Sequence, residues 1–234
     1  MSSLFLTPEW FNGIDVIFEL IGLVIALLIS GYSWKSYRVS GEVRLRYFSL
    51  AFLLIGFSFF VKILTSSAVY YQEVRMVADT FIRPALGPDR EYSVIFYKGG
   101  FFLEMASMLG GWLLLFFISQ KARERLKKYY ELSQMGLFVY LVLLVSWVAS
   151  FKYVAFYLTS TVLISLIVLN YYKNYLNNNN KNTLSIMNSF SLMLLGNIFF
   201  VFMFLTPLFY VLGQVFLLLG FILLLYTYMK VRWK

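Results

Sequence analysis

The chain has 234 residues, of which 61% are hydrophobic, 21% aromatic and only 13% charged, whereas soluble domains are typically about 25% charged. This composition excludes a soluble globular protein and predicts an all-α integral membrane protein; at about 20 residues per spanning helix, the length accommodates about seven helices and no separate domain. The chain has no His and no Cys, which excludes histidine-ligated haem and zinc, Ser-His nucleophiles, disulfides and thiolate chemistry.

Apolar runs separated by charged residues, Asn or Pro predict a seven-transmembrane-helix bundle that forms a single transmembrane domain over residues 1–234. In chain order, the predicted helices are Trp10–Tyr32, Tyr47–Val69, Val94–Ser119, Leu132–Ser150, Val154–Asn170, Leu184–Leu205 and Leu208–Met229. Few residues separate the fourth helix from the fifth, or the sixth from the seventh, so both pairs are expected to be tight hairpins. A re-entrant fourth or fifth segment is the alternative. The N-terminal residues carry no Lys or Arg before the first apolar run, so we expect that run to be a retained helix.

The distribution of charge predicts the orientation of the bundle. The segments that follow the first, third, fifth and seventh helices are rich in Lys and Arg, whereas the segments on the opposite side hold about as many acidic as basic residues. Because basic loops stay on the cytoplasmic side, we expect the N-terminus outside and the C-terminus in the cytoplasm. The net charge of +9 then requires no nucleic acid partner. The expected location is a multi-pass position in a lipid bilayer, the plasma membrane of a prokaryotic cell.

Short matches within the chain predict an internal repeat. Gly56 with the run 59–61 in the second helix matches Gly196 with the run 199–201 in the sixth, 140 residues later. Gly111 in the third helix matches Gly220 in the seventh at an offset of 109, and a weaker match at an offset of 138 joins 35–37 to 173–175. These matches predict a 3+1+3 parallel repeat with the fourth helix as a linker. Chance identity between Leu- and Phe-rich spans is the alternative.

Seven helices with the N-terminus outside and the C-terminus inside form an architecture similar to that of PQ-loop sugar transporters, microbial rhodopsins and seven-helix receptors. The similarity is one of topology. The chain has no Pro-Gln pair, and residues 214–224 of the seventh helix contain no Lys for a retinal Schiff base. No functional residue is therefore transferred from these families.

Ionisable residues inside predicted spans mark the candidate site, because each needs a partner or a water-filled cavity. They are Asp15, Glu19, Lys62, Lys98 and Glu104, all in the first three helices. At about 1.5 Å of rise per residue, Glu19, Lys62 and Glu104 lie at one depth, roughly 10 to 12 Å below the outer boundary.

Helical spacing also places these charges beside small residues on one stripe of each helix, for example Glu19 with Gly22 and Ala26. The sequence therefore predicts Lys62 between two carboxylates, with Asn197 and Gln214 opposite. Three interpretations stay open: a structural ion triad, a binding site for a ligand or ion, and a docking site for another membrane protein.

Two further segments carry charge. The basic run Lys121, Arg123, Arg125, Lys127 and Lys128 extends the third helix into the cytoplasm, where it would contact anionic lipid or a protein partner, although positive-inside anchoring alone also explains it. The outer loop 70–93 mixes apolar and charged residues around the turn at 87–89. We expect either a short interfacial helix that covers the outer mouth or a solvated loop.

No nucleophile, metal-ligand set or phosphate-binding glycine loop accompanies the charges, so we expect a protein that is not an enzyme and needs no cofactor or metal. The sequence favours a receptor or sensor that binds a small ligand or membrane partner at the outer cluster and signals to a cytoplasmic partner. The first alternative is a transporter or channel for a small cation or polar solute. The second is a structural subunit of a membrane complex.

Overall fold

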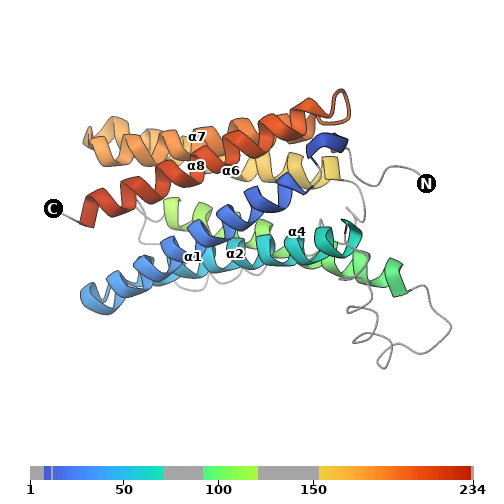
Figure 1. Ribbon diagram of the computed structural model, residues 1–234. Helices are drawn as coiled ribbons and strands as arrows, with labels where there is room; N and C mark the ends of the chain where they lie inside the picture. The colour runs from blue at the N-terminus through green and yellow to red at the C-terminus, as the bar shows by residue number, and fades with distance from the viewer. Residues whose placement is uncertain (1–7, 12, 71–91, 121–152, 233–234) are drawn as a thin grey trace, which may run out of the picture.

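The computed structural model describes residues 8–11, 13–70, 92–120 and 153–232 (Figure 1). Several sequence predictions fall outside these ranges. They are the fourth helix at 132–150, nearly all of the outer loop at 70–93 and the basic run at 121–128.

The described chain is helical. A short 3-10 helix, η1 (Glu9–Phe11), precedes α1 (Ile14–Ser40), α2 (Val43–Tyr70) and α4 (Tyr92–Gln120); α6 (Tyr153–Asn178), α7 (Lys181–Val201) and α8 (Leu208–Arg232) complete it. All six α-helices contain a stretch long and apolar enough to cross a membrane. They correspond to six of the seven predicted spans, so the described residues indicate a multi-pass helical membrane protein.

Several helix boundaries differ from the prediction. α1 continues to Ser40 rather than Tyr32, α2 begins at Val43 rather than Tyr47, and α6 continues to Asn178 rather than Asn170. Hydropathy locates only the apolar part of a helix, whereas backbone hydrogen bonding continues through polar residues until a cap ends it. The sixth predicted span is shifted in the other direction, because α7 already ends at Val201.

Left-handed residues provide two of these caps. Gly41 (φ 68°) ends α1, and its N–H donates to the carbonyl oxygen of Tyr37 at 2.8 Å. Asn179 (φ 46°) ends α6, and its N–H donates to the carbonyl oxygen of Tyr175 at 2.7 Å. Glycine and asparagine are the residues that tolerate this conformation. A two-residue turn therefore joins α1 to α2, and another joins α6 to α7.

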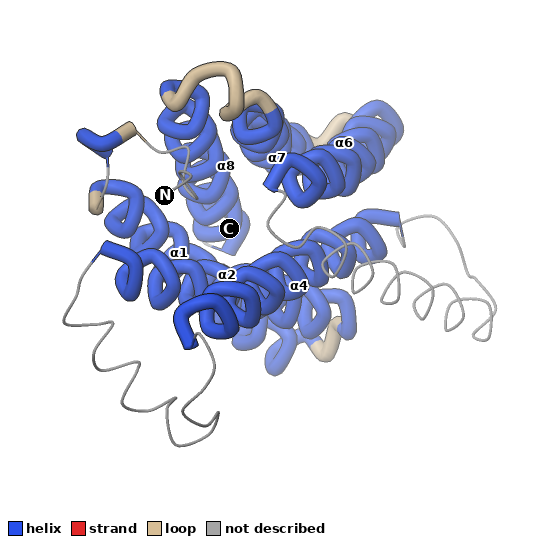
Figure 2. Tube along the Cα trace, turned by 90° about the vertical axis from the view of Figure 1, so that its right-hand side faces the viewer, coloured by secondary structure: helices blue, strands red, loops and turns tan. Residues whose placement is uncertain are grey.

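The helices pack as two groups of three, which we call the first triplet (α1, α2, α4) and the second triplet (α6, α7, α8). In each triplet the middle helix packs along both of its neighbours. The triplets meet where α4 packs on α6 and α1 packs on α8, and the end view in Figure 2 shows the two groups side by side. The described chain begins and ends at opposite ends of the bundle (Figure 1).

The outside of the bundle is apolar. Leu20, Leu27 and Leu53 are each about half exposed, and they are typical of side chains that face lipid rather than water. The interior contains large aromatic rings, with Phe221 of α8 against Phe52, Phe59 and Trp112 of the first triplet. The core therefore lies at the boundary between the triplets.

The predicted glycine pairing is only partly compatible with this packing. A Cβ at Gly111 would lie 2.9 Å from the carbonyl oxygen of Ala51, and a Cβ at Gly220 would lie 2.8 Å from that of Ser189, so both glycines face the preceding helix of their triplet. Gly56, in contrast, faces α1, whereas Gly196 faces α8. The contacts of these two glycines therefore do not support the predicted match between Gly56 and Gly196 at an offset of 140.

Candidate functional site

An ion pair joins the first two helices inside the bundle. The Nζ atom of Lys62 on α2 lies 2.8 Å from Oε1 of Glu19 on α1, and Glu19 is completely buried. The small residue one turn below Glu19 permits this geometry, because a Cβ at Gly22 would lie 3.1 Å from the ring of Phe59. The second carboxylate oxygen, Oε2 of Glu19, has no hydrogen-bond partner among the described residues. The positive charge of Lys62 is therefore the main interaction that offsets the burial of this carboxylate.

Lys62 also connects the two triplets. Its Nζ atom lies 5.7 Å from the centre of the Tyr210 ring on α8, a distance at which a cation is attracted by the face of an aromatic ring. Only 17% of the side chain is exposed. The lysine therefore contributes a bond within the first triplet and a contact between triplets.

Glu104 on α4 is buried separately from this pair. Glu104 is 5% exposed. Oγ of Ser58 on α2 donates to the backbone carbonyl of Glu104 at 2.9 Å, which fixes α4 against α2. Among the described residues, the carboxylate of Glu19 lies within 4 Å of Lys62 Nζ, whereas the carboxylate of Glu104 does not. The sequence predicted Lys62 between two carboxylates, but the lysine pairs with one of them and the other remains a separate acidic group.

Glu104 and Lys62 line a common cavity between the triplets. Its walls come from α2, α4, α6, α7 and α8, with the lining residues Phe59, Lys62, Glu104, Met108, Trp112, Phe156, Tyr157, Asn197, Phe200, Gln214 and Leu217. The centre of a water molecule can move within about 20 Å³ of this space, which is enough for roughly one water-sized species.

Asn197 and Gln214 lie where the sequence placed them, across the cavity from the first triplet. Asn197 Nδ2 donates to the carbonyl oxygen of Met193 at 2.9 Å, within its own helix. Gln214 Nε2 donates to the hydroxyl of Tyr210 at 3.1 Å. Each amide therefore has one of its two N–H donors engaged, and its second N–H and its carbonyl oxygen remain available to a ligand.

Asp15 is described by the structure but is not among the cavity-lining residues. Asp15 accepts hydrogen bonds from the backbone N–H groups of Gly13 and Val16, both at 2.9 Å, at the start of α1. An acidic residue at this position stabilises a helix N-terminus. Lys98 belongs to α4, but its side chain lies outside the described part, as do all five predicted cytoplasmic contact residues of the run 121–128.

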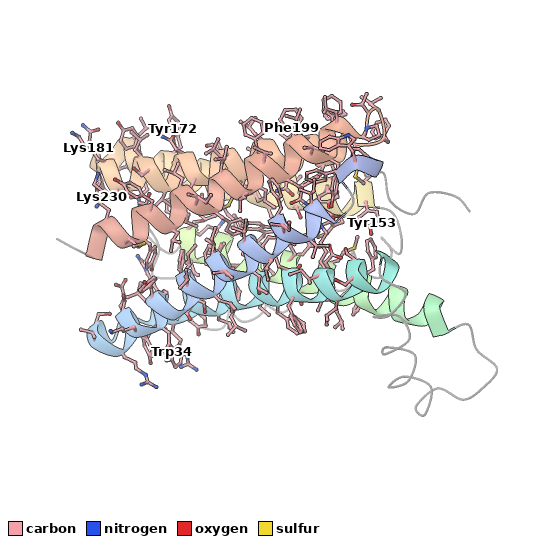
Figure 3. The ribbon with its side chains drawn as sticks, viewed as in Figure 1. Trp34, Tyr153, Tyr172, Lys181, Phe199 and Lys230 are labelled. Carbon is pink, nitrogen blue, oxygen red and sulfur yellow. The ribbon has the colours of Figure 1, made fainter. Side chains whose placement is uncertain are left out.

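Sequence reasoning missed the aromatic half of the lining, which includes Trp112, Phe156, Tyr157 and Phe200. Aromatic residues are too frequent in this chain, at 21%, for any one of them to signal a site. Tyr157 is nevertheless stacked on Phe200, with ring centres 4.6 Å apart, and Figure 3 shows the side chains that fill the space between the two helix groups.

Chemically, the cavity offers one unpaired carboxylate, one neutralised ion pair and two amide carbonyls inside aromatic walls. Among the described residues no group of three His, Cys, Asp or Glu side chains is arranged to hold a metal ion. A cavity with this lining could hold a small polar or charged species of about the size of water. No family model, no curated protein and no solved structure matches this chain.

Proposed function

We propose that the protein is a membrane carrier for a small solute, which binds in the cavity between the two triplets. The observation that supports this function is the position of the cavity, because side chains from both triplets line it. Transporters built from two parallel repeats bind their substrates at the interface between the repeats and move one repeat against the other.

We also propose that the two triplets are related by an internal duplication, at an offset that differs from the 140 residues predicted from sequence identity for α2 and α7. α1 and α2 correspond to α6 and α7 at an offset of 138, which also relates the two-residue turns and their left-handed residues, Gly41 and Asn179. The same offset relates the buried residues of the first helices. These are Glu19, Gly22, Ile25, Ala26 and Ile29 in α1, and Tyr157, Ser160, Leu163, Ile164 and Ile167 in α6.

The third helices correspond at an offset of 109, and the contacts between helices support both offsets. Ser58 of α2 touches the backbone carbonyl of Glu104 in α4. At the corresponding positions, a Cβ at Gly196 of α7 would lie 2.8 Å from the carbonyl oxygen of Gly213 in α8. The contact of α4 with α6 then corresponds to that of α8 with α1, as two parallel repeats around one axis require.

This register explains the composition of the cavity. Glu19, Lys62 and Glu104 correspond to Tyr157, Phe200 and Gly213, so the charged half of the site belongs to one repeat. The duplicated halves have therefore diverged into a charged wall and an aromatic wall, and a solute between them contacts both.

Hydrogen bonds between the triplets close the end of the bundle that contains the α1–α2 turn. Oγ of Ser33 on α1 lies 3.3 Å from the Tyr228 hydroxyl on α8, and Nδ2 of Asn170 on α6 donates to Oγ of Ser119 on α4 at 3.0 Å. In the orientation indicated by charge, this end is cytoplasmic. A carrier would alternate between this closed arrangement and one in which the two bonds are broken.

The test uses the absence of cysteine from the chain. Met108 lines the cavity, so in a Met108→Cys variant a membrane-impermeant thiol reagent should react when it is added from either side of the membrane. Met193→Cys is the matched control, because Met193 is completely buried outside the cavity lining and should react from neither side. Met229→Cys, at an exposed position near the end of α8, should react from one side and identify the cytoplasmic face.

The same experiment separates the alternatives. Reaction of Met108→Cys from the outside alone, with the cytoplasmic control reactive, contradicts a carrier and favours a receptor that couples to a partner through the basic run at 121–128. Absence of reaction from both sides contradicts an accessible site and favours a structural subunit.

A further inference from the structure

The cavity contains three groups that can accept hydrogen bonds from a ligand. Asn197 and Gln214 each use one amide N–H on a neighbouring residue, and each also carries a carbonyl oxygen that can accept. The carboxylate of Glu104 is a third acceptor, and it forms no hydrogen bond or ion pair with another described side chain. A ligand that donates several hydrogen bonds can therefore use all three of these acceptors.

The charges of the cavity favour a monovalent cation as its ligand. Lys62 and Glu19 form an ion pair at 2.8 Å, whereas Glu104, which is 5% exposed, has no ion-pair partner within 4 Å among the described residues. A buried charge without a partner is strongly unfavourable. One positive charge beside Glu104 would make the group of three side chains and its ligand neutral.

The walls and the size of the cavity favour an ammonium ion over a metal cation. Five of the eleven lining residues are aromatic, and aromatic faces attract ammonium groups at sites from which water is excluded. Metal cations prefer a complete shell of oxygen ligands, whereas this cavity offers one carboxylate and two amide carbonyls in walls that are otherwise mainly aromatic and apolar. The space of about 20 Å³ suits an ion of about the size of water.

We propose that the solute is a small ammonium cation, ammonium or methylammonium, that pairs with Glu104 and donates to Asn197 and Gln214. This inference rests on the proposed function, because it names the solute that binds in the same cavity. Binding of the cation does not depend on its passage across the membrane, so the two proposals are tested separately.

The test is the thermal unfolding midpoint of the full chain in detergent, measured in chloride salts at equal ionic strength. Ammonium and methylammonium should raise the midpoint relative to choline, by roughly 3 °C or more at ten times the dissociation constant. Sodium and potassium should leave the midpoint at its value in choline. Choline serves as the reference because its quaternary nitrogen carries no N–H that could donate to Glu104, Asn197 or Gln214.

Glu104→Gln should abolish the ammonium-dependent rise, while a monodisperse elution profile in choline shows that the variant folds. Glu42→Gln removes the same charge at an exposed position in the α1–α2 turn and should retain the full rise. Gln214→Met, which removes one acceptor at similar volume, should reduce the rise.

The proposal is overturned by an equal rise in sodium or potassium, by a rise that persists in Glu104→Gln, or by no rise in any salt. Because no ammonium is needed for thiol labelling, a negative result here leaves the carrier proposal unaffected. Reaction of Met108→Cys from one side only would leave the cation site unaffected.

Discussion

Replacement of Lys62 by Met tests the energetic role of the ion pair. Glu19 is completely buried, and the described residues provide its Oε2 atom with no hydrogen bond, so the substitution leaves a buried carboxylate without compensation. Removal of one partner of a buried ion pair costs about 3 to 5 kcal/mol. For a chain of this length, that loss lowers the unfolding midpoint by roughly 10 °C.

The distances also predict which second substitution restores stability. Lys62→Met combined with Glu19→Gln should recover most of the loss, because a neutral amide needs no counter-charge. Lys62→Met combined with Glu104→Gln should not, because Glu104 is not within 4 Å of the lysine. Thermal unfolding of the three variants in detergent provides the coupling energies of a double-mutant cycle.

Two results would refute this reasoning. A midpoint unchanged in Lys62→Met would mean that the pair contributes nothing to stability, and that Glu19 finds water or a proton at little cost. Equal recovery with Glu19→Gln and with Glu104→Gln would mean that the lysine compensates both carboxylates, as the sequence alone suggested.

The remaining predictions concern packing and orientation. Gly220→Ala should destabilise the protein, since its Cβ would lie 2.8 Å from a backbone carbonyl oxygen, whereas Gly31→Ala, with nothing within 4 Å of the new Cβ, should be neutral or slightly stabilising; equal unfolding midpoints would contradict the close approach of α8 to α7. A reporter active only in the cytoplasm should work when fused after Lys234 and be silent when inserted near Gly87, and the reverse pattern would overturn the orientation indicated by charge.

The sequence determines the class of the protein and the approximate position of its helices. Long apolar runs leave no other way to satisfy backbone hydrogen bonds in a membrane, and six of the seven predicted runs are helices within the described residues. Periodicity also places Glu19 and Glu104 on buried faces, because residues three and four apart lie on one side of a helix. Charge in an apolar run, as at Lys62, is rare enough to mark a site.

Tertiary structure decides which charges meet and what surrounds them. The sequence predicts a similar depth along the helix axes for Glu19, Lys62 and Glu104, but which of them form an ion pair depends on how each helix is rotated and how closely it approaches its neighbour. Helix rotation depends in turn on contacts such as Gly111 against the backbone at Ala51, which a pattern of apolar residues does not reveal.

The same limitation applies to the relation between the triplets. Sequence identity predicts an offset of 140 between α2 and α7, whereas the duplication that we propose has an offset of 138, which relates the left-handed residues Gly41 and Asn179. A turn constrains backbone conformation rather than residue type, so Gly and Asn perform the same role without matching in sequence. The aromatic wall around Tyr157 follows from the same cause, since only the packing of the second triplet against the first distinguishes a lining aromatic residue from the many that face lipid.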